Sequence, residues 1–101
     1  MDNQKRKRLE AAGYRITDAA DWLGLTPQEQ ALVRMRVSFA LEIERLRDEK
    51  KLTQAALAAK IGTKQSGVAR MLGNPASATI DNLLKTLLAL GATPRRIAAL
   101  I

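Results

Sequence analysis

The sequence contains neither cysteine nor histidine. Without cysteine the chain has no disulfide framework and no thiolate metal site. Without histidine it has no Ser-His-Asp or Cys-His triad and no histidine acid–base chemistry. Glu42 and Glu44 are a close carboxylate pair outside the helix caps, but residues two apart do not face each other on a helix. We therefore expect no enzymatic activity, no metal site and no cofactor.

Glycine, proline and long apolar runs are also scarce. Six Gly and three Pro among 101 residues are too few for a turn-rich all-β chain. The longest stretch without a charged side chain, residues 71–80, has ten residues, and a transmembrane helix needs about twice that length. No secretory signal precedes it. We expect a soluble, cytoplasmic protein that makes no contact with a membrane.

Positive charge is concentrated in the second half of the chain. Residues 51–101 carry seven cations and one anion, Asp81, which gives +6 of the total net charge of +7. This imbalance favours the hypothesis that the chain binds a polyanionic partner over the alternative that its basic surface serves only solubility. A separate basic run at the start, Lys5 to Arg8, is expected to be a solvated terminus, and the alternative is an arm that follows DNA.

The length and the composition indicate one small globular domain with a tail. We expect a basic tail and a short helix in residues 1–25, a main domain in residues 26–92, and a short C-terminal helix in residues 93–101. The helix in the first segment is predicted at residues 18–23, after Thr17. Its Trp22 is expected to pack against the main domain.

A long helix is predicted over residues 27–50. Thr26 and Glu29 have the spacing of a capping box, and Pro27 fits the first helical position. Apolar residues at steps of three and four predict one buried stripe: Leu32, Met35, Phe39, Ile43 and Leu46. Three more apolar residues widen that stripe: Val33, Val37 and Leu41. The extra width predicts a second packing surface, for the N-terminal helix or for a dimer partner.

Shorter helices follow, and the chain is predicted to be all-α with five to six helices. Four threonines are each expected to cap a helix: Thr53 at residues 54–60, Thr63 at residues 64–72, and Thr79 and Thr93 at the helices that begin there. In the first of these, three residues are expected to face inward: Ala56, Leu57 and Ile61. In the helix that starts at Thr79 and ends at Gly91, the expected inward residues are Ile80, Leu83, Leu84, Leu87 and Leu88. Ile97, Leu100 and Ile101 share one side of the last helix.

Two short helices joined through a glycine are typical of a helix-turn-helix, whose second helix enters the major groove of DNA. At the start of that second helix, Lys64, Gln65 and Ser66 are suited to base edges, because Gln pairs with adenine and Lys with guanine or phosphate. Gly67 costs about 1 kcal/mol relative to Ala in mid-helix, which is explained if the backbone approaches a base. Arg70, one turn beyond Ser66, is expected to reach a phosphate or a base.

An ordered set of motifs resembles the Xre-type (lambda-repressor-like) helix-turn-helix family. The set consists of Leu52-Thr53-Gln54, then Ala55-Ala56-Leu57-Ala58, Gly62 and Gln65-Ser66-Gly67-Val68. The resemblance covers residues 46–91 and implies that Gln54 binds phosphate and braces Gln65, eleven positions later, against its base. The order Gly73-Asn74-Pro75 departs from the family's usual turn, so phosphate contacts from that turn are not carried over.

Residues 13–27 and 88–94 also resemble a subfamily of small bacterial Xre-type regulators, many of which look like antitoxins. The leading hypothesis is a homodimeric repressor that reads a palindromic operator in double-stranded DNA through residues 64–72. Its dimer interface is expected to include the apolar C-terminal segment. The alternative is an antitoxin that neutralises an RNA-cleaving toxin by direct binding and represses its own operon. Trp22 and the carboxylates of the long helix would then contact the toxin.

Overall fold

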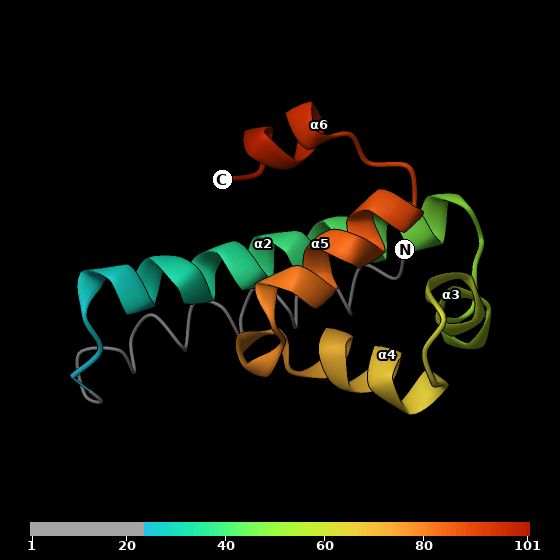
Figure 1. Ribbon diagram of the computed structural model, residues 1–101, viewed down its shortest axis with the longest axis horizontal. Helices are drawn as coiled ribbons and strands as arrows, with labels where there is room; N and C mark the ends of the chain where they lie inside the picture. Colours follow the sequence, from blue (N-terminus) through green and yellow to red (C-terminus); the bar gives the residue numbers. More distant parts are fainter. Residues whose placement is uncertain (1–23) are drawn as a thin grey trace.

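Helices build the fold in the computed structural model, in which residues 24–101 are described. Their order is α2 (Pro27–Glu49), α3 (Gln54–Ile61), α4 (Gln65–Gly73), the 3-10 turn η1 (Pro75–Ser77), α5 (Ile80–Ala89) and α6 (Pro94–Ala99) (Figure 1). These residues contain no strand, so the all-α prediction is confirmed. The predicted helix at residues 18–23, with Trp22, and the basic run at residues 5–8 lie outside the described residues.

Helix α2 begins where the sequence predicts. The hydroxyl of Thr26 accepts a hydrogen bond from Glu29 N (3.1 Å), and the Glu29 carboxylate accepts one from Thr26 N (3.0 Å). This capping box satisfies two backbone donors that a helix start leaves free. The two donated hydrogen bonds also hold the pKa of the Glu29 carboxyl below its ordinary value.

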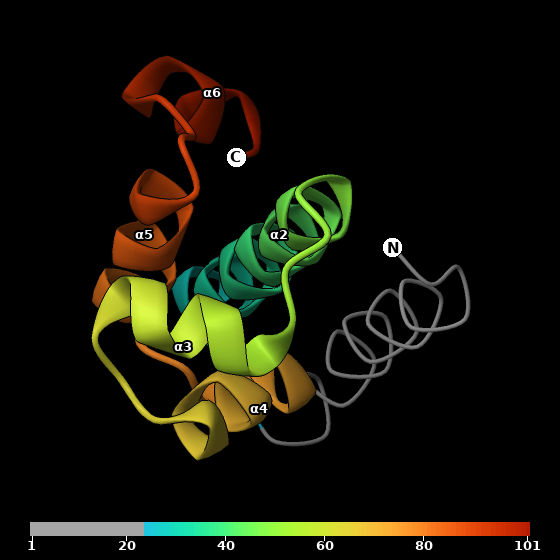
Figure 2. The ribbon, with the colours of Figure 1, turned by 90° about the vertical axis from the view of Figure 1, so that its right-hand side faces the viewer.

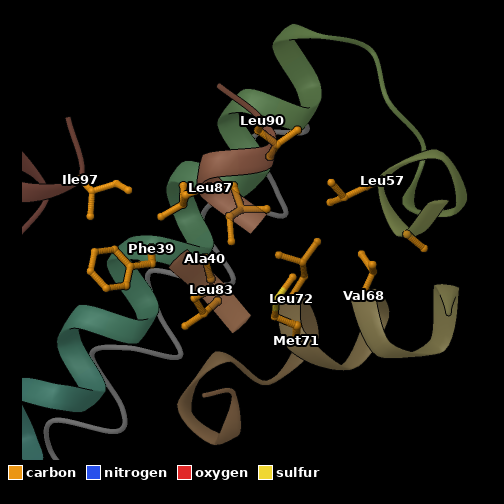
Figure 3. Close-up of a cluster of buried hydrophobic side chains, with 12 residues drawn as sticks. Phe39, Ala40, Leu57, Val68, Met71, Leu72, Leu83, Leu87, Leu90 and Ile97 are labelled. Atoms are coloured by element: carbon orange, nitrogen blue, oxygen red, sulfur yellow. The ribbon is translucent and has the colours of Figure 1, made fainter. Parts of the chain in front are cut away.

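The core lies where α2 packs along α5 and η1, and where α3 and α4 cover the remaining side (Figures 1 and 3). Its buried members come from every described α-helix: Phe39, Ala40, Ile43, Leu57, Ala58, Val68, Met71, Leu72, Leu83, Leu87, Leu90 and Ile97. Burial of one such large apolar side chain contributes about 1.5–3 kcal/mol. Close packing of these residues fixes the orientation of α4 on the rest of the domain.

Three predicted core positions are wrong. Ala56 is exposed, and its place in the core is taken by Ala58, which is on the same side of α3 as Leu57. Leu88 is 51% exposed because the buried stripe of α5 continues from Leu87 to Leu90 instead. Leu32 is 40% exposed near the start of α2. At these three positions the buried stripe is narrower than the apolar pattern of the sequence, because the neighbouring helices cover only part of it.

Threonine caps are confirmed at three of the four predicted starts after α2. The hydroxyls of Thr53, Thr79 and Thr93 accept from backbone N–H groups at distances of 3.0, 3.2 and 3.1 Å. The fourth prediction is wrong, because α4 begins one residue later than expected, with Lys64 as its N-cap instead of Thr63. No side chain caps that helix.

Two carboxylates, Glu42 and Glu44, lie buried on α2. Glu42 is 4% exposed and Glu44 is fully buried. Glu42 binds Arg45 in the same helix and Arg96 of α6, and Glu44 accepts a hydrogen bond from Arg47 (Nη2 to Oε2, 3.0 Å). The toxin-contact hypothesis relied on the long-helix carboxylates, and these two are not accessible to a partner.

Candidate nucleic-acid interface

Helices α3 and α4 form a tight helix-turn-helix unit (Figure 2). Gly62 ends α3 with a φ of +72°, a left-handed conformation that glycine adopts without a side-chain clash. The N–H of Thr63 then donates to Ala58 O (2.9 Å), so that the chain reverses within a three-residue turn. The turn sets the direction of α4 relative to α3.

One side of α4 is buried and the other is exposed. Val68, Met71 and Leu72 face the core (Figure 3). The structure brings together five of the six predicted DNA-binding residues on or beside the opposite face, all of them exposed: Lys64, Gln65, Ser66, Gly67 and Arg70. The helix thus presents amide, hydroxyl and cationic groups outward without loss of core packing.

The sixth predicted residue, Gln54, is the first residue of α3 and is half-buried. Each of Gln54 and Gln65 opens its helix. Within residues 24–101, no hydrogen bond joins the two side chains, so the bracing of Gln65 by Gln54 stays a prediction.

The start of α4 differs from the threonine-capped helix starts around it. Because no side chain accepts from its first turn, the N–H groups of Gln65 and Ser66 are left for water or for a ligand. The positive end of a helix dipole lies at the same place. Both properties favour an anion, such as a DNA phosphate, in front of this turn.

Gly67 has an intramolecular explanation that the sequence did not reveal. A Cβ atom at this position would lie 3.1 Å from Thr63 Oγ1, closer than ordinary van der Waals contact. The turn that leads into α4 therefore favours a residue without a side chain here. Close approach of the backbone to a base stays a second, untested reason.

The loop after α4 is held by a residue that the sequence analysis missed. Arg36 of α2 donates through Nη1 to the carbonyl oxygen of Ala76 (3.3 Å). The Ser77 hydroxyl donates to Asn74 O (3.0 Å) within the same loop. Arg36 and Ala76 are 40 residues apart in sequence, so no local pattern indicates the contact. The bond fixes η1, which connects α4 to α5.

Cations on α3, α4 and α5 are less neutralised than those on α2. Arg45 and Arg47 form ion pairs with glutamates of their own helix. Lys60, Lys64 and Lys85, in contrast, are exposed and form no ion pair with any described residue, and the same holds for Arg70. No carboxylate occurs between Glu49 and Asp81. The surface around α4 is therefore positive, which suits a polyanion.

Residues 24–101 contain neither a candidate metal site nor a candidate membrane-spanning helix. These residues hold no group of three or more Asp, Glu, His or Cys side chains placed to bind a metal ion. In the same part of the chain, each helix is too short or too polar to span a lipid bilayer.

Comparison with known proteins gives one family. A family model described as a helix-turn-helix domain matches residues 19–94, a range that includes α2 to α5 and the first residue of α6. No curated protein and no solved structure matches the chain.

Proposed function

The chain belongs to the helix-turn-helix domain family, and from that premise we propose that it is a sequence-specific transcriptional repressor of the Xre type. Membership supports the general role of a DNA-binding regulator. The observation that carries the finer proposal is the outer face of α4, where five polar, small or cationic residues lie exposed with no carboxylate nearby in sequence.

Base recognition is proposed for the start of α4. A glutamine side chain forms two hydrogen bonds with the N6 and N7 edge of adenine, and a serine hydroxyl fits several base edges. Gln65 and Ser66 occupy the first turn of α4, where a recognition helix comes nearest to the bases. Lys64, directly before them, would bind a guanine or a phosphate.

Affinity is proposed to come mainly from phosphates. The proposed phosphate contacts are Arg70, exposed on α4, and the half-buried Gln54, the first residue of α3. For each phosphate that the protein neutralises, the logarithm of the binding constant falls by about 0.9 for every tenfold increase in salt concentration. A complex built on several cations is therefore expected to weaken steeply as salt is added.

A homodimer is proposed because one recognition helix covers only one half-site. Two-fold pairing matches a palindromic operator, whose half-sites lie about one helical turn of DNA apart. The C-terminal segment is the proposed contact: Ile101 is 71% exposed, and Leu100 is half-buried. Ile97 is buried in the domain's own core, so it takes no part in the contact.

Selection of bound sites from a library of random duplexes tests this function. The full chain is expected to enrich one motif with two inverted half-sites, centred about 10 base pairs apart. As a matched control, the variant Arg95→Gln, which changes an exposed cation of α6, should enrich the same motif. Recovery of unrelated sequences at every round would contradict sequence-specific binding, and a single asymmetric half-site would contradict the dimer.

A further inference from the structure

A hollow of about 320 Å³ lies between α4 and α5, beside the proposed DNA-binding face. Four apolar residues line it: Ile61, Val68, Met71 and Ala78. Val68 and Met71 belong to the buried core, whereas Ile61, at the end of α3, and Ala78, in the loop before α5, are half-buried. The hollow thus has an apolar floor that the protein itself covers only in part.

Polar groups surround this floor on both sides. Ser77, Thr79 and Asn82 line the side next to α5. The Ser77 hydroxyl donates to Asn74 O, so the donors on this side are the Thr79 hydroxyl, which only accepts within its cap, and the Asn82 side-chain amide. Arg70 lines the hollow from α4, and Lys85 lines it from α5. Neither cation forms an ion pair with a described residue, and no described carboxylate lines the hollow. Two cations from two helices therefore face one space without a counter-ion.

We propose that this hollow is a binding site for a small organic anion, with an apolar body on the floor and a phosphate or carboxylate group between Arg70 and Lys85. The volume lies within the usual range of small-molecule sites, which are mostly apolar with a few polar groups that fix orientation. Cationic side chains make the strongest hydrogen bonds to such anionic groups.

The floor distinguishes this ligand from a DNA strand. A backbone phosphate would engage Arg70 and Lys85 at the edge but would leave the half-buried surfaces of Ile61 and Ala78 in contact with water. An apolar body covers that surface and gains about 25 cal/mol for each Å² removed from water. A ligand with both an apolar body and an anionic group therefore covers the floor and binds the two cations at the same time.

Arg70 gives the site a consequence for regulation, which rests on the proposed function. The same guanidinium lines the hollow and lies beside the proposed base-reading residues of α4. An anion bound in the hollow would draw Arg70 away from DNA. The ligand would then act as an inducer that weakens operator binding.

Titration of the full chain without DNA tests the site independently of any operator. The probes are phenyl phosphate, inorganic phosphate and phenol, each followed by the backbone amide resonances of the protein. Phenyl phosphate is expected to shift the amides of Gly67, Ser77 and Asn82 in a saturable manner. The other two probes should bind at least about tenfold more weakly, because each lacks one half of the ligand.

Lys85→Gln is the variant that reports on the anion-binding group, with circular dichroism as a check on folding. Loss of one charge-assisted hydrogen bond is expected to weaken phenyl phosphate binding by about fivefold or more. Arg95→Gln is the matched control, because α6 lies at the opposite end of the domain from α4 in both views (Figures 1 and 2). It should leave the binding of phenyl phosphate unchanged.

Three results would overturn the proposal. Equal binding of inorganic phosphate and phenyl phosphate would reduce the hollow to a contact for DNA phosphates. Equal binding of phenol and phenyl phosphate would remove the role of the two cations. Saturable shifts elsewhere, or none, would remove the site. None of these results depends on DNA binding, so the proposed function stands or falls separately.

The regulatory consequence has its own measurement, made on a duplex recovered by site selection. Phenyl phosphate is expected to raise the apparent Kd of the wild-type chain for this duplex and to have a smaller effect on Lys85→Gln. An unchanged Kd at saturating phenyl phosphate would contradict the inducer role.

Discussion

Arg96 of α6 donates a hydrogen bond through Nε to Oε2 of Glu42 on α2, at a distance of 2.8 Å and across 54 residues of sequence. Glu42 is 4% exposed, and Arg45 occupies its other oxygen. The pair holds the last helix against the long one, next to Ile97 in the core. The charge of a carboxylate buried in this way is compensated only while the cations that pair with it are in place.

Arg96→Gln is therefore expected to destabilise the protein modestly. The Arg96 side chain is 51% exposed, and Glu42 keeps its bond to Arg45, so a loss of about 1 kcal/mol is expected. Urea unfolding measures it. Arg95→Gln removes a neighbouring charge that has no ion pair with a described residue, and it should cost less. Equal stability of the two variants would contradict a role of the α2–α6 bond.

Acidification is expected to weaken the same contact. Burial raises the pKa of the Glu42 carboxyl, but hydrogen bonds and charge from Arg45 and Arg96 outweigh that effect and hold the pKa below its ordinary value. A depressed pKa in the folded state means that the stabilisation is complete above the unfolded value, about 4.3. It is lost as the pH falls through the folded value.

The gap in unfolding free energy between the wild type and Glu42→Gln should accordingly be widest near pH 6–7 and narrow below about pH 5. Glu49→Gln, at an exposed carboxylate on the same helix, is the control and should show a smaller gap. A gap for Glu42→Gln that stays constant down to pH 2 would show that its charge contributes nothing to folding.

Lys51 has a φ of +56°, the left-handed conformation that glycine adopts most easily. Lys51→Gly is expected to change stability by less than about 1 kcal/mol, because relief of strain offsets the greater freedom of glycine in the unfolded chain. Lys51→Val should lose more than 1 kcal/mol, since a β-branched residue fits this conformation poorly. Thermal unfolding checks both variants, and equal melting temperatures would contradict the strain.

Assembly can be tested at the exposed end of the chain. Ile101→Asp is expected to shift the protein toward monomer in sedimentation, because it puts a charge into the proposed apolar contact. Leu32→Asp alters another exposed apolar residue, at the start of α2, and should leave the dimer intact. The opposite pattern would place the interface on α2. A monomeric wild type at tens of micromolar would instead favour a different protein partner.

Local patterns predicted most of the fold. The capping box of Thr26 and Glu29 and the burial of Leu83 and Leu87 on α5 depend on residues within one or two helical turns, so the sequence indicates them directly. The exposed positions of Lys64, Gln65, Ser66 and Arg70 follow from the same periodicity. Their contacts with DNA stay a prediction.

Features that depend on tertiary packing were not predictable in this way. The burial of Glu42 depends on Arg96, and the position of η1 depends on Arg36, each far away in sequence. Burial of Leu90 instead of Leu88 depends on how α5 ends and how α6 returns to the core. The hollow beside α4 exists only because α4 and α5 pack at a particular separation.

The most direct test of the account is the affinity of Gln65→Ala for a selected duplex and for a random duplex, measured at the same salt concentration. If Gln65 reads an adenine, the variant should lose about 1–3 kcal/mol on the selected site and little on random DNA. It should also accept other bases at one position, with unchanged helix content, because the side chain is exposed on α4. An equal loss on both duplexes would assign Gln65 to phosphate and contradict recognition of bases by the start of α4.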